Sequence, residues 1–111
     1  MRLHGTLRMP DDHALHGHEV ARVRLLDVSR ADAPAVTVAE TSIGLVGTAL
    51  AVDFDLDVPS LDPRATYALS AHVDTNGSGD VSVGDLLTMQ HVGVSPTATD
   101  HSYDVPLQTV T

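Results

Sequence analysis

Apolar and polar residues alternate in segment after segment of this chain. The apolar positions of residues 65–73 are Ala65, Tyr67, Leu69, Ala71 and Val73. In residues 48–58 they are Leu50, Val52, Phe54, Leu56 and Val58. Successive side chains of a strand point to opposite faces of the sheet, so a period of two predicts strands with one buried face.

The alternation changes phase in residues 19–28. Apolar residues run in one parity from Ala21 to Leu25, and the parity then switches at Leu26 and Val28. One extra residue in a strand pair has this effect. The sequence therefore predicts a bulge or a strand bend near Leu26.

Seven strands are predicted in all, separated by turns rich in Gly and Pro. They lie at about 2–9, 19–28, 35–41, 47–58, 65–73, 86–94 and 102–110. Short strands with such spacing are typical of antiparallel sandwiches. We expect a single all-β domain over residues 1–111, a seven-stranded antiparallel β-sandwich with under about a tenth of its residues helical.

Composition excludes several classes of function. The net charge is −9 and the six basic residues are all Arg, so binding to nucleic acid or to anionic membranes is disfavoured. No cysteine is present, which excludes disulfides and thiolate metal sites. No Gly-x-Ser-x-Gly motif occurs, and we expect no enzyme.

Residues 74–85 match the twelve-residue EF-hand calcium loop. The predicted ligands are the side chains of Asp74, Asn76, Ser78, Ser82 and Asp85 together with the backbone carbonyl of Asp80. Calcium takes about 6–8 oxygens, and Gly79 stands where the chain must turn around the ion. A polar surface turn is the alternative interpretation. The sequence predicts a non-enzymatic module in which one Ca²⁺ orders this loop, with a weak affinity of about 10⁻⁵–10⁻³ M because position 12 is Asp and not Glu.

Three further groups of residues are candidate sites. His13, His16 and His18 cluster beside acidic residues, but their spacing matches no closed metal site, so we expect at most weak transition-metal binding. The aspartates at 53, 55 and 57 are interpreted as a solvated strand face, whose like charges weaken strand pairing unless Arg22, Arg24 or another cation lies opposite. His72 is interpreted as an exposed histidine, with contact to the calcium loop as the alternative.

The sequence leaves the location of the protein open. Residues 1–6 lack the apolar stretch of a signal peptide. We expect either a cytoplasmic protein or, if an export segment has been removed, a periplasmic or extracellular one.

Two stretches resemble a known bacterial family. Residues 27–40 contain an Asp-x-Ser turn between two predicted strands, and residues 61–71 contain an Asp-Pro-Arg segment leading into a strand. Both are similar to the YbaY/YscW-like lipoproteins, which include the type III secretion pilotin chaperones. The family's signal segment and lipid-bearing cysteine do not occur within residues 1–111.

This resemblance implies a transthyretin-like or immunoglobulin-like sandwich. It also implies an exported, lipid-anchored protein without a catalytic set, and the pilotin branch assists secretin assembly. An interaction domain that binds a protein partner is therefore the alternative to the calcium-binding module.

Overall fold

A computed structural model describes residues 2–10, 19–30, 32–44, 51–75, 83, 85–88, 92–96 and 102–110. Within these residues the chain forms strands and no helix, so the all-β prediction is confirmed. Accordingly, the described part contains no helix long and apolar enough to span a membrane. The strands are β1 (Arg2–Arg8), β2 (Val20–Asp27), β3 (Val36–Gly44), β4 (Ala51–Asp57), β5 (Tyr67–Asp74), β6 (Leu86–Leu87), β7 (Val92–Val94), β8 (Ser102–Pro106) and β9 (Gln108–Thr109).

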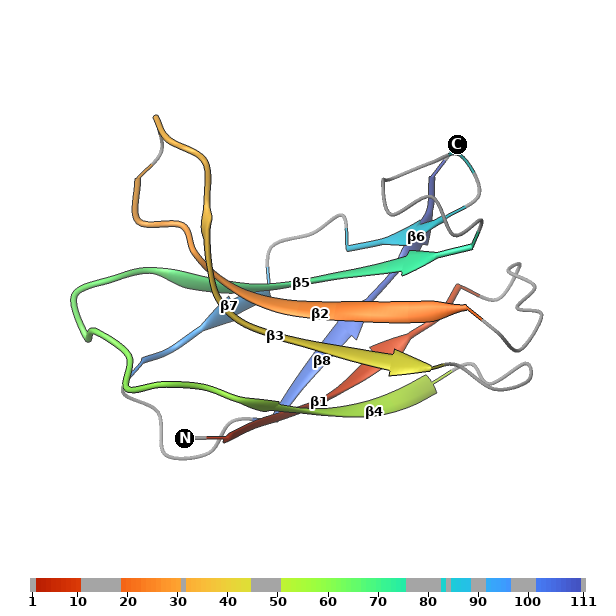
Figure 1. The fold of residues 1–111 in the computed structure, drawn as a ribbon, viewed down its shortest axis with the longest axis horizontal. Coiled ribbons are helices and arrows are strands. Elements are labelled where there is room, and N and C mark those ends of the chain that lie inside the picture. Colours follow the sequence, from red (N-terminus) through yellow and green to blue (C-terminus); the bar gives the residue numbers. More distant parts are fainter. Residues whose placement is uncertain are drawn as a thin grey trace.

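The strands form two sheets that enclose one core (Figure 1). The smaller sheet has the order β4-β1-β8, and the larger has the order β3-β2-β5-β6-β9, with β7 also paired to β5. The buried apolar side chains come from both sheets, including Leu3 and Leu7 of β1 and Val23 and Leu25 of β2. This arrangement confirms the sandwich-like architecture that the alternation predicted.

The strand count and the strand directions differ from the prediction. Segment 86–94 contains two strands, β6 and β7, which both pair with β5 but at different positions. Segment 102–110 also contains two, because the chain leaves the smaller sheet after β8 and joins the larger one as β9. At the change of sheet, the Leu107 N–H donates to the Arg8 carbonyl over 2.9 Å. The Leu107 side chain is buried.

The expectation of wholly antiparallel sheets is wrong for one pair. β8 runs parallel to β1, in a register from His4 opposite Ser102 to Arg8 opposite Pro106. Alternation identifies a strand and its buried face, but it carries no information about direction relative to a neighbour 90 or more residues away.

The bulge predicted near Leu26 is confirmed. Leu25 pairs with Ala39 while Leu26 pairs with Thr37, so Val38 is the extra residue, on β3. A bulge bends the strand and increases its twist. Beyond this point the end of β2 and the start of β3 turn away from the sandwich (Figure 1). We call residues 26–38 the arm; all but Ala31 are described.

A tyrosine fixes the passage from β4 in the smaller sheet to β5 in the larger one. The Asp62 N–H donates to the Tyr67 hydroxyl oxygen over 2.9 Å. The Asp62 side chain accepts a hydrogen bond from the Arg64 N–H, also over 2.9 Å. A tyrosine near the start of a strand that is bonded to backbone a few residues upstream is typical of immunoglobulin-like sandwiches. This crossover holds the base of the arm.

Candidate interaction site

The two stretches that resemble the lipoprotein family meet at the base of the arm. The Val28 N–H donates to the Thr66 carbonyl over 2.8 Å. In return, the Thr66 N–H donates to Ser29 Oγ over 2.9 Å. These two bonds fasten the end of β2 to the segment that leads into β5, and we call them the arm clamp. Local sequence patterns did not predict this contact.

Asp27 completes the turn at the same place. The Ser29 N–H donates to Asp27 Oδ1 over 2.9 Å. Hydrogen bonding from Ser29, first from its hydroxyl and then from its N–H, lowers the pKa of Asp27, and the nearby Arg30 charge lowers it further. Asp27 is therefore a carboxylate at neutral pH.

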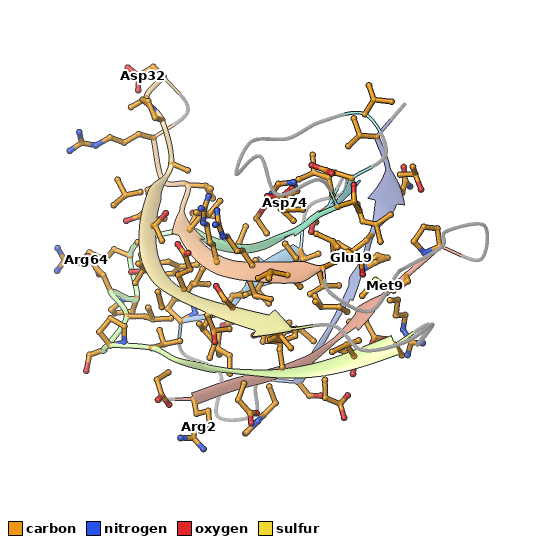
Figure 2. The ribbon with its side chains drawn as sticks, turned by 45° about the vertical axis from the view of Figure 1, so that its right-hand side comes forward. Arg2, Met9, Glu19, Asp32, Arg64 and Asp74 are labelled. Carbon is orange, nitrogen blue, oxygen red and sulfur yellow. The ribbon has the colours of Figure 1, made fainter. Side chains whose placement is uncertain are left out.

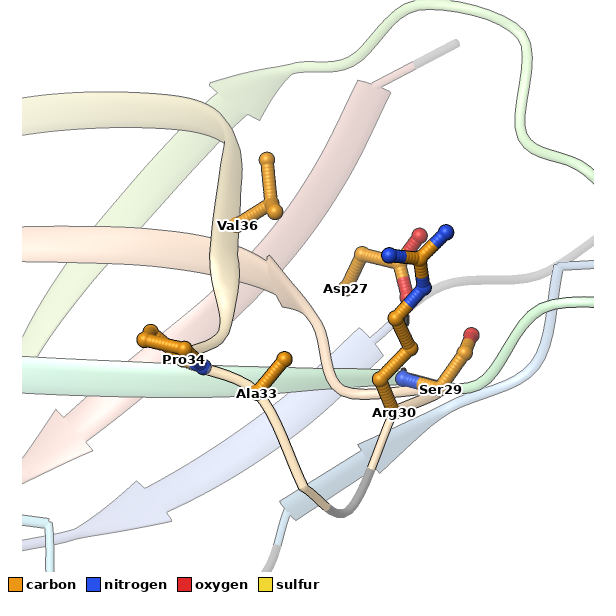
Figure 3. A pocket seen from close by; sticks show the side chains of 6 residues that line it. All are labelled: Asp27, Ser29, Arg30, Ala33, Pro34 and Val36. Atoms are coloured by element: carbon orange, nitrogen blue, oxygen red, sulfur yellow. Dashed lines mark hydrogen bonds between the residues drawn. The ribbon is translucent and has the colours of Figure 1, made fainter.

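A hollow of about 320 Å³ lies against the arm (Figure 3). Its lining has a polar part and an apolar part, formed by Asp27, Ser29, Arg30, Ala33, Pro34 and Val36. The Arg30 guanidinium forms no hydrogen bond or ion pair with any described residue. Val36 is 64 % exposed, although it is a large apolar residue in a strand. Asp32 lies at the far end of the arm, away from the sandwich (Figure 2).

The hairpin of β5 and β6 brings the two ends of the predicted calcium loop together. His72 pairs with Leu87 and Val73 with Leu86, so continuing the same register puts Asp74 opposite Asp85. Loop positions 1 and 12 are thus neighbours, as an EF-hand loop requires. The other four predicted ligands, Asn76, Ser78, Asp80 and Ser82, lie outside the described residues.

Asp85 is already bonded to protein groups. Its Oδ1 accepts hydrogen bonds from the Thr75 N–H over 3.0 Å and from the Thr75 hydroxyl over 2.7 Å. Its Oδ2 lies 2.8 Å from His72 Nε2. The carboxylate is fully buried, and the described residues contain no group of three metal-ligating side chains. A calcium ion bound by both Asp85 oxygens would have to compete with these partners.

The contact with Asp85 corrects the interpretation of His72. Its side chain is only 15 % exposed, so it is not the exposed histidine that the polar face of the strand indicated. The alternative, contact with an end of the predicted calcium loop, is confirmed.

The aspartates of β4 form an outer, solvated face, as predicted. All three are exposed, and each contacts a residue of β1. Arg2 Nε lies 3.0 Å from an Asp57 oxygen, the Thr6 hydroxyl donates to Asp53 over 3.0 Å, and His4 contacts Asp55.

The cation opposite this face is Arg2, whereas the other two candidates, Arg22 and Arg24, lie elsewhere. Both belong to β2 in the larger sheet, where Arg24 is paired with Glu40 over 3.0 Å. Sequence alternation placed the aspartates on the correct face, but it did not determine which strand lies beside them.

The histidine cluster at 13, 16 and 18 lies outside the described residues. The neighbouring Glu19 is described, and it is buried with 2 % of its surface exposed. That residue is therefore not part of a solvated polar loop.

Comparisons with known proteins agree with this fold. Residues 1–105 match the family model described as "Type III secretion system lipoprotein chaperone (YscW)". Among solved structures, the chain is similar to an alternative pilotin from the type II secretion system of Vibrio cholerae. The two chains are 25 % identical with a TM-score of 0.84, over 100 % of this chain and 97 % of that one. A search of curated proteins gave no match.

The chain belongs to the YscW family of secretion lipoprotein chaperones. These proteins are not enzymes, and neither is this chain.

Sequence reasoning missed the hollow on the arm. Two signals for it were present: the change of parity at Leu26, and the apolar stretch 33–36 where a polar turn would be ordinary. Only the structure shows that Arg30 and Asp27 lie beside that stretch (Figure 3).

Proposed function

We propose that this chain acts as a pilotin, a lipoprotein chaperone that binds a secretin subunit and assists its assembly in the bacterial outer membrane. The family match over residues 1–105 carries this proposal. The likeness to a type II secretion pilotin along the whole chain supports it independently. The chaperone would work in the cell envelope, where secretins assemble.

The structure offers a physical basis for such a role. The two-sheet body buries its apolar side chains in one core, while the arm carries exposed apolar residues away from it. The acidic, lysine-free surface disfavours nucleic acid and anionic lipid as partners. A protein partner suits these properties best.

Deletion of the gene in the source bacterium tests the proposal. We expect secretin multimers to disappear from the outer-membrane fraction, and to return when the gene is supplied on a plasmid. Purified chain should also retain the secretin subunit on an affinity column. Normal secretin multimers in the outer membrane of the deletion strain would refute the assignment.

Calcium binding by the 74–85 loop is a second proposal. The register of β5 and β6 favours it, because continuing that register by one pair brings Asp74 opposite Asp85. The hydrogen bonds from Thr75 and His72 to Asp85 argue for weak binding, because the ion must replace or share them. Such an ion would order a loop and would take no part in catalysis.

A further inference from the structure

We propose that the hollow on the arm holds one aliphatic side chain and the adjoining peptide group of the secretin subunit. This inference rests on the proposed function, and it goes further by naming the binding surface and the chemistry of the bound segment. The surface consists of the polar residues 27, 29 and 30 and the apolar residues 33, 34 and 36.

The apolar part of the hollow fits an aliphatic side chain. Ala33, Pro34 and Val36 are all exposed, and a projecting arm leaves them in contact with water. Transfer of apolar surface out of water is favourable, at roughly 25 cal/mol per Å². A volume of about 320 Å³ is at the small end of the range for ligand sites, which suits a few groups of a partner and not a large cofactor.

The polar part fits a peptide group. Asp27 is an acceptor: its carboxylate accepts hydrogen bonds from Ser29 and, with about four lone-pair sites in a carboxylate, has capacity left for a further donor. Arg30 is a donor without a hydrogen-bonded partner among the described residues. A peptide group has one N–H donor and one C=O acceptor, so it matches both side chains at once. A carboxylate ligand would be repelled by Asp27, and an ammonium group would be repelled by Arg30.

The arm clamp prepares this surface for binding. Val28 and Ser29 are bonded to Thr66, so the base of the arm keeps its orientation relative to β5 before any partner arrives. A preformed surface loses less conformational freedom on association, which favours affinity.

The net negative charge of the chain favours a different protein as the occupant of the hollow, and disfavours a second copy of this chain or a membrane. A second copy would bring another net charge of −9 to an already acidic surface. An anionic lipid surface is disfavoured for the same reason. The remaining candidate is a segment of the secretin subunit, the partner that the proposed function names.

Matched substitutions test the surface. Val36→Asp and Arg30→Met alter the apolar and polar parts of the hollow. Val83→Asp is the control for the first, because Val83 is 77 % exposed and does not line the hollow. Arg64→Met is the control for the second, because Arg64 is an exposed arginine of the β4–β5 crossover. Affinity for immobilised secretin subunit from the same bacterium is measured in the presence of a calcium chelator, and melting curves check that each variant folds.

We expect Val36→Asp and Arg30→Met each to weaken binding at least about tenfold, and the two controls to stay within about twofold. If the wild-type chain binds but all four variants bind equally well, the hollow is not the site and the pilotin assignment stands. If the wild-type chain does not bind the secretin subunit, the proposed function fails and this inference fails with it. A dimer in size-exclusion chromatography that Val36→Asp dissociates, with secretin binding unchanged, would identify a second copy as the occupant and overturn the proposal.

Discussion

Gly5 lies in the middle of β1, between β4 on one side and β8 on the other. A Cβ at this position would lie 2.5 Å from the Phe54 ring and 2.6 Å from the Tyr103 carbonyl oxygen. The absence of a side chain therefore lets the single phenylalanine of the chain pack against the central strand of the smaller sheet.

We predict that Gly5→Ala destabilises the protein by about 1–3 kcal/mol, the usual cost of overpacking a core. The measurement is the free energy of unfolding from urea denaturation. Gly44→Ala is the control, because no atom of the described residues, its chain neighbours aside, lies within 4 Å of its Cβ position. Equal unfolding free energies for both variants would contradict the packing argument.

The lowered pKa of Asp27 leads to a prediction about how the stability of the folded chain depends on pH. Hydrogen bonds from Ser29 lower its pKa, so Asp27 stabilises the folded chain at neutral pH. This contribution is lost as the pH falls through the lowered pKa. Ser29→Ala removes the hydroxyl, the larger cause, and should raise the pKa of Asp27 toward its ordinary value. Titration of the Asp27 carboxyl carbon by NMR checks this, and identical curves for variant and wild type would count against it.

At the scale of elements, the β5–β6 hairpin can be tested for calcium binding. Millimolar calcium should raise the melting temperature by at least several degrees, because an ion that binds only the native state stabilises it and a kilocalorie per mole is worth about 4–8 °C in a domain of this size. Magnesium should be much less effective.

Asp74→Ala is the informative variant and should abolish the calcium effect. Asp85→Ala would not separate the causes, because it also removes the bonds to Thr75 and His72. Superimposable melting curves of the wild type in chelator and in about 5–10 mM calcium, a severalfold excess over a weak site of ~10⁻³ M, would end the calcium proposal.

Local patterns predicted the elements well, and their partners poorly. Alternation found the buried faces of β4 and β5, and the change of parity at Leu26 marked the position of the bulge, whose extra residue lies on β3. Alternation alone did not predict the hydrogen bond between His72 and Asp85, because a contact across a hairpin depends on the register of its two strands. The arm clamp joins Val28 and Ser29 to Thr66, 38 and 37 positions further along the chain, and nothing in either stretch encodes that separation.

At the scale of the whole molecule, the two sheets are not independent. β8 belongs to the smaller sheet and β9 to the larger, and buried Leu107 lies between them. The alternation of apolar and polar residues over 102–110 predicted one strand. A change of sheet at a buried residue leaves that alternation almost intact, so the break between β8 and β9 does not show in the sequence.

We predict that the protein unfolds in one cooperative transition. A strand segment shared between two sheets, with a common core, links the loss of one sheet to the loss of the other. Calorimetry should give equal calorimetric and van't Hoff enthalpies, as two-state unfolding requires. Two resolved transitions would show that the sheets unfold separately.

The parallel pairing of β1 with β8 has a mechanical consequence. β1 lies near the start of the chain and β8 near its end, and both run in the same direction. A force that pulls the two ends of the chain apart acts on these strands in opposite directions along their length. The hydrogen bonds between them are then loaded in shear and must break together, whereas an antiparallel hairpin pulled at its open end unzips one bond at a time. The β1–β8 pair therefore resists tension between Arg2 and Pro106 better than an antiparallel hairpin of the same length pulled at its open end.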